Sequence, residues 1–117
     1  MNDRISKVVH KGREVVILDL SGLMPAEIVP IMLEFTEYVV EQRCTRHLVD
    51  ITDTFITAEV EKAVAAARSS VSDRLGEIKS ALVGARGVQM VLAGAIDKKQ
   101  YLARSREDAL NHLASEP

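Results

Sequence analysis

The chain alternates short apolar runs with longer segments of helical period, and this alternation limits its fold more than any other feature. Strand-like runs occupy residues 5–11, 15–20, 46–51, 78–83 and 100–103. Segments with apolar side chains three and four positions apart, typical of helices that bury one face, occupy residues 25–42, 57–71 and 88–96. Strands that alternate with helices predict a mostly parallel sheet built from successive βα turns with right-handed crossovers.

The two ends of the chain complete this α/β pattern. Residues 5–11 and 15–20 flank a turn at Gly12 and predict a hairpin, so the first strand should be antiparallel and lie at an edge. Ser105 and Asp108 resemble a capping box that opens a terminal helix with Ala109, Leu110 and Leu113 inside. The expected order is ββαβαβαβα within one domain, residues 1–117.

Two helix boundaries stay open at this point. Pro30 interrupts the first helical segment, so that helix either begins near Val29 or has a kinked first turn. Residues 72–76 are either a break or a continuation of the second helix.

Composition excludes several classes of protein. The net charge is −2, with two Phe, two Tyr and no Trp, so nucleic-acid binding by bulk electrostatics or base stacking is not expected. Cys44 is the single cysteine, which fits a reducing compartment. The first residues have no apolar signal-peptide core, and no run is long enough to span a bilayer. We therefore expect a cytoplasmic protein.

Three stretches carry a resemblance to a known family. They are VVILDLSG at 15–22, HLVDITD at 47–53, and ALVGARGVQMVLAGAI at 81–96 followed by SREDALNHL at 105–113. Together they resemble the SpoIIAA-like family of the STAS (anti-sigma-factor-antagonist) fold. Members commonly have an acidic residue and Trp before the last Leu of the terminal helix, where this chain has Asn111 and His112 before Leu113.

The resemblance implies a fold and a class of function. The implied sheet is wound from successive βα turns, with helices mainly on one face. Members resemble non-enzymatic modules that act in regulation through protein partners, such as a kinase or another regulator. By likeness to CRAL-TRIO lipid carriers, the alternative is a carrier or sensor of a hydrophobic, lipid-like molecule.

The second strand bears on the oligomeric state. Residues 15–20 are apolar on both alternating faces, so something must cover the face that the helices leave open. The cover is a second subunit, the terminal helix or a lipid-like ligand. From this we expect a homodimer.

Ligands of parallel α/β sheets bind outside the carboxyl ends of the strands. The residues expected at that edge, for a ligand or a partner, are Ser21, Gly22, Asp50, Thr52, Asp53, Thr54, Gly84, Arg86 and Gly87. In phosphorylated STAS proteins the acceptor is a Ser of a D-S-S-G-like turn in the matching loop. That turn is missing here, and Thr52, Thr54 or Thr57 would take its place. The alternative is that Thr57 is a helix N-cap and the others bond turn amides.

Other candidate residues have equally plain structural roles. Gly84, Arg86 and Gly87 open a helix where an anion could bind, but tight packing also explains the glycines. Asp19, Asp50 and Asp53 form a candidate carboxylate group without a nucleophile or phosphate cradle. His10, His47 and His112 lack metal-ligand spacing and are expected at the surface or an edge. No catalytic residue, metal or cofactor is predicted, and a small enzyme using Asp50 and Asp53 ranks last.

Overall fold

The structure is a computed structural model that describes residues 3–85 and 100–115. Its five strands are β1 (Ile5–His10), β2 (Arg13–Asp19), β3 (Arg46–Asp50), β4 (Lys79–Val83) and β5 (Tyr101–Ala103). The described helices are α1 (Pro25–Gln42), α2 (Ala58–Leu75) and α4 (Arg106–Ala114). The helix expected at 88–96 lies outside the described residues.

The strands form one mixed sheet in the order β1-β2-β3-β4-β5. β1 pairs antiparallel with β2, and the other neighbours pair parallel. The α/β class and the antiparallel first strand at an edge are therefore confirmed. Sequential order brings the carboxyl ends of β2, β3 and β4 together, and Asp19 lies beside Asp50 in the ladder.

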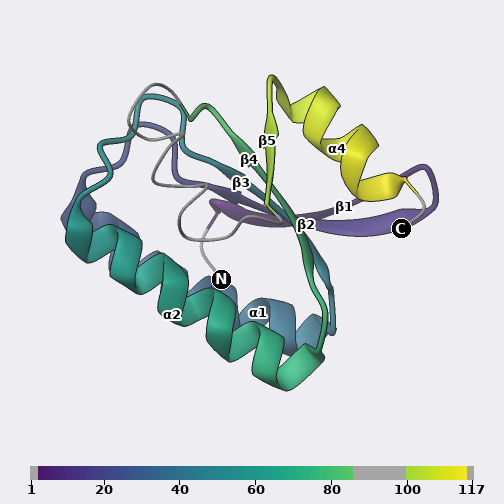
Figure 1. The fold of residues 1–117 in the computed structure, drawn as a ribbon, viewed down its shortest axis with the longest axis horizontal. Helices are drawn as coiled ribbons and strands as arrows, with labels where there is room; N and C mark the ends of the chain where they lie inside the picture. Colours follow the sequence, from purple (N-terminus) through teal and green to yellow (C-terminus); the bar gives the residue numbers. More distant parts are fainter. Residues whose placement is uncertain (1–2, 86–99, 116–117) are drawn as a thin grey trace.

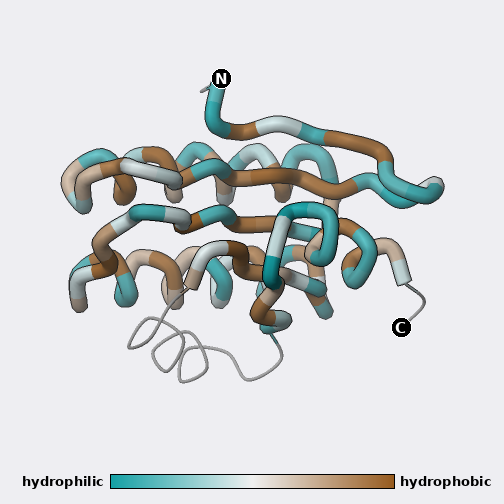
Figure 2. The backbone as a smooth tube through the Cα atoms, turned by 90° about the horizontal axis from the view of Figure 1, so that it is seen from above, coloured by the Kyte–Doolittle hydropathy of each residue, from teal (hydrophilic) through white to brown (hydrophobic). Residues whose placement is uncertain are grey.

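Two layers of helices sandwich the sheet. α1 and α2 lie side by side on one face, and α4 packs on the other (Figure 1). The long hydrophobic stretches of the inner strands (Figure 2) supply both cores. On the α4 face, Ala109 and Leu113 cover Val15, Ile17 and Leu48. Of the three groups that could cover β2, the terminal helix is the one that does so. The resemblance implied helices mainly on one face, and the position of α4 differs from that.

Helix boundaries follow from local chemistry. α1 begins at Pro25 and contains Pro30, so a start near Val29 is wrong. Pro30 is exposed and removes only one bond of the first turns, and the Glu27 carboxylate accepts the Met24 amide at 3.1 Å. α2 continues through residues 72–75, and Gly76 ends it with a φ of 85°.

At α4 the predicted box is half formed. Ser105 accepts the Asp108 amide at 3.1 Å, but the Asp108 carboxylate accepts the amide of Arg104. None of the helices in the described ranges has both the length and the apolar character needed to cross a membrane.

Candidate functional site

The polar side chains at the carboxyl edge of the sheet form hydrogen bonds with one another. Ser21 donates its amide and hydroxyl to Asp19 Oδ1, at 3.0 and 2.5 Å. Thr52 does the same to Asp50 Oδ1, at 3.0 and 2.6 Å. Two adjacent strands therefore end in the same turn, an aspartate that holds the hydroxyl residue two positions later.

Arg106 of α4 joins these two turns. Its Nε donates to Asp50 Oδ2 at 2.8 Å, and its Nη2 lies 3.4 Å from Asp19 Oδ2. The bond to Asp50 is the main cause of a raised pKa of Arg106. Burial favours the neutral form of Asp19, but bonds from Ser21 and the charges of Arg106 and Arg4 outweigh it and lower its pKa. Both carboxylates are thus partnered, which suits a structural clamp better than an acid–base pair.

The candidate phosphoacceptors have different surroundings. Thr54 is buried, and its hydroxyl donates to the Leu20 carbonyl at 2.5 Å. Thr57 is the N-cap of α2 and accepts the Val60 amide at 3.2 Å. Thr52 is half-buried and bonded to Asp50. Phosphorylation at Thr52, Thr54 or Thr57 stays a prediction, and at Thr54 it requires the loop to open first.

The remaining edge residues are accounted for in part. Gly84 has a φ of 89°, and a Cβ there would lie 2.6 Å from the Thr52 amide nitrogen, so close packing requires this glycine. Arg86 and Gly87 lie outside the described residues, and so does the anion site expected there. Asp53 is exposed, with a φ of 56°. Within residues 3–85 and 100–115, no group of three or more His, Cys, Asp or Glu side chains could hold a metal ion.

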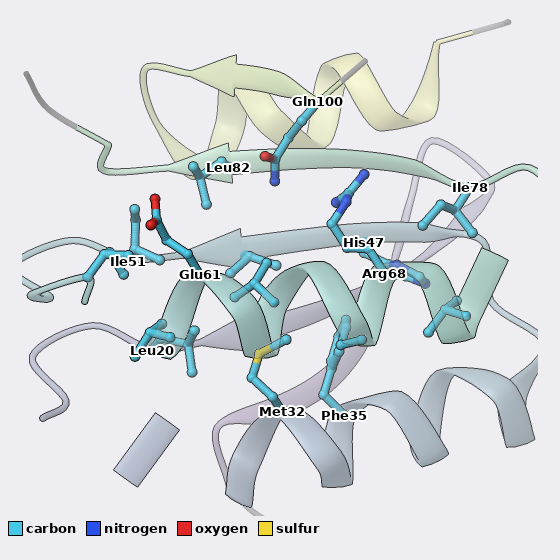
Figure 3. Close-up of a pocket in the computed structure, with 16 residues that line it drawn as sticks. Leu20, Met32, Phe35, His47, Ile51, Glu61, Arg68, Ile78, Leu82 and Gln100 are labelled. Carbon is cyan, nitrogen blue, oxygen red and sulfur yellow. The ribbon is translucent and has the colours of Figure 1, made fainter. Parts of the chain in front are cut away.

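A cavity between α2 and the sheet is the other candidate site, and sequence reasoning missed it. Its empty volume is about 790 Å³, counting the part that is open to solvent. Aliphatic side chains of α2, the sheet and the adjoining loops supply most of its wall, with Met32 and Phe35 from α1 (Figure 3). The polar lining residues are His47, Glu61, Arg68 and Gln100. An apolar wall with few polar groups is typical of small-molecule sites.

His47 lies in this wall and is only 3% exposed, so its predicted surface position is wrong. Its ring packs edge-on against Phe35 at 5.3 Å, and Nε2 lies 2.6 Å from the Cys44 carbonyl. Because a carbonyl only accepts, Nε2 carries the proton. Burial is the main cause that lowers the pKa of His47 to about 4, and the Arg68 charge adds to it. The imidazole is therefore neutral at pH 7.

Arg68 also lines the cavity, and its charge acts on His47. It comes from α2 and donates to Ser80 Oγ of β4 at 2.7 Å. Burial lowers its pKa. His47 and Ser80 are ladder partners on β3 and β4, so helix and sheet hold these polar groups together on one side of an apolar space. The signal in the sequence was a polar residue within the buried strand at 46–51.

No family model, curated protein or solved structure matches the chain.

Proposed function

We propose that this chain is a non-catalytic binding module that holds a hydrophobic small molecule in the cavity between α2 and the sheet. The lining of the cavity carries the proposal, because a mostly apolar wall with a few polar groups is typical of ligand pockets. The partnered carboxylates Asp19 and Asp50 support a non-enzymatic role, since their hydrogen bonds fix them within the fold.

The SpoIIAA-like assignment is part of the same proposal. The antiparallel edge strand and the sequential strand order support it. The position of α4 on the opposite face departs from what the resemblance implies. A cytoplasmic location agrees with the single, buried, free Cys44. The homodimer stays a prediction. It was expected because a second subunit could cover the open face of β2, but α4 covers that face.

A second candidate function is regulation through protein partners. Met24 and Phe55 favour it, because both are large apolar side chains exposed in loops at the carboxyl edge.

A cavity-filling variant tests the first function. We expect the neutral apolar dye N-phenylnaphthylamine to bind the wild-type protein and fluoresce. Ala67 lines the cavity, so Ala67→Phe should fill it and weaken dye binding at least about tenfold. Ala66 is an exposed neighbour on the same helix, and Ala66→Phe is the matched control that should leave binding unchanged.

Circular dichroism establishes that both variants are folded. No dye binding to the wild type would mean that the chain's own side chains fill the cavity, and the proposal would be wrong. Equal binding by the wild type and by Ala67→Phe would place the dye elsewhere and would also contradict it.

A further inference from the structure

Two loops at the carboxyl edge form one connected surface on the α1–α2 side of the sheet. They are residues 20–24, between β2 and α1, and residues 51–57, between β3 and α2. The Gly22 amide donates to the Thr52 carbonyl at 3.1 Å, and Thr54 Oγ1 donates to the Leu20 carbonyl at 2.5 Å. The surface is therefore built from loops that hold each other in place.

Each loop exposes one large apolar side chain directly beside one that packs into the core. Leu23 belongs to the core cluster and Ile56 packs against it, whereas Met24 is 65% and Phe55 is 72% exposed. Anchored loops keep these two side chains in water, although burying an aromatic side chain is worth roughly 2 kcal/mol or more. Met and Phe are also enriched in the centres of protein interfaces. Because the two loops are hydrogen-bonded to each other, Met24 and Phe55 make a candidate contact surface.

Among residues 3–85 and 100–115, acidic side chains are exposed beside the two apolar side chains. Glu27, Asp53 and Glu59 are exposed in or next to the same loops. The nearby cations Arg4 and Arg106 are bonded to the Asp19–Asp50 turns. Arg106 belongs to α4, which packs on the opposite face of the sheet (Figure 1). An acidic rim favours a basic partner and disfavours an anionic lipid surface.

We infer that Met24 and Phe55, with the rim of Glu27, Asp53 and Glu59, form a docking surface for a protein segment that carries apolar side chains flanked by Lys or Arg. The inference rests on the second proposed function, regulation through protein partners, and not on the cavity.

The probe is a phage-displayed library of random linear peptides, selected on the immobilised full chain. Enriched peptides should combine apolar residues with Lys or Arg, and their affinity should fall as salt rises. Phe55→Ala should weaken a selected peptide about tenfold or more, as for a central interface residue. Leu33 is equally exposed but lies on α1, and Leu33→Ala should leave the affinity unchanged. Ala67→Phe should also leave it unchanged, which separates this surface from the cavity.

Several results would overturn the inference. They are no enrichment, enrichment of acidic peptides, or equal loss of affinity in Phe55→Ala and Leu33→Ala. Phe55-dependent binding to vesicles of phosphatidylcholine and phosphatidylglycerol would assign the surface to lipid instead. A dimer in sedimentation that Phe55→Ala dissociates would assign it to a second copy. Dye binding that persists while peptide binding fails would leave the cavity function standing alone.

Discussion

At the scale of residues, His47 links the cavity to the stability of the fold. It is a titratable group in an apolar wall, with Phe35 and the Cys44 carbonyl against its ring and Arg68 and Glu61 along the same lining. Its folded pKa of about 4 lies below the ordinary value of 6.5. The unfolded chain therefore takes up the proton first as the pH falls.

This linkage predicts that His47 stabilises the fold fully above pH 6.5 and that the contribution is lost as the pH falls toward 4. The loss is about 3 kcal/mol by pH 4, at 1.36 kcal/mol for each pKa unit. Urea unfolding of the wild type at pH 7.5 and pH 4.5 measures it, with His47→Gln as the reference that keeps a donor for Cys44. Because the other titratable groups are common to both proteins, their contributions to the pH dependence cancel in the comparison. A wild type and variant with the same pH dependence would show that His47 is not the source.

At the scale of elements, the position of α4 depends on a small number of polar contacts and one apolar face. Ala109 and Leu113 bury against β2 and β3, and Arg106 fixes the first turn of the helix to the strand ends. Asp50 is 6% exposed, so it needs its cationic partner more than a surface carboxylate would.

Arg106→Ala should lower the free energy of unfolding by about 1–3 kcal/mol, because it leaves the buried Asp50 carboxylate with the Thr52 bonds alone. The full cost of a broken buried ion pair is not expected, since Arg106 is nearly half exposed. Arg74→Ala removes the exposed pair with Glu37, at 3.3 Å, and should cost less than about 1 kcal/mol. Chemical denaturation compares the two, and equal losses would refute the clamp.

The sequence predicted the elements better than the sites, for physical reasons. Apolar runs, helical period and the turn and cap residues together located the described strands and helices, because these signals depend on local structure and on which face is buried. It did not separate the two alternatives at Pro30, since one missing hydrogen bond near a helix start is a small cost.

The candidate site depends on contacts between distant segments. Arg106 reaches Asp50 across 56 positions, and the partnering of the edge carboxylates was therefore not predicted. The cavity also escaped sequence reasoning, because its apolar wall has the same composition as a filled core. The polar residue within a buried run, His47, was the available signal, and it was interpreted as a surface histidine.

At the scale of the whole molecule, the sheet separates two kinds of face. Among the described elements, α4 packs on one face over a small apolar core, and α1 and α2 lie on the other face, where the cavity lies beside α2 (Figures 1 and 3). The loops at the carboxyl edge line part of the cavity with Leu20, Ile51 and Ile56, and they expose Met24 and Phe55 to solvent. This arrangement supports the proposed binding role, and the ion pairs of Arg106 with Asp19 and Asp50 hold α4 to the strand ends.

The most direct test of the central claim is native mass spectrometry of the protein purified from its own host, followed by denaturation of the same sample. A binding module for a hydrophobic small molecule should carry an additional mass that is lost on denaturation and is absent from Ala67→Phe. A wild-type protein that shows only the mass of its bare chain before and after denaturation would contradict the account.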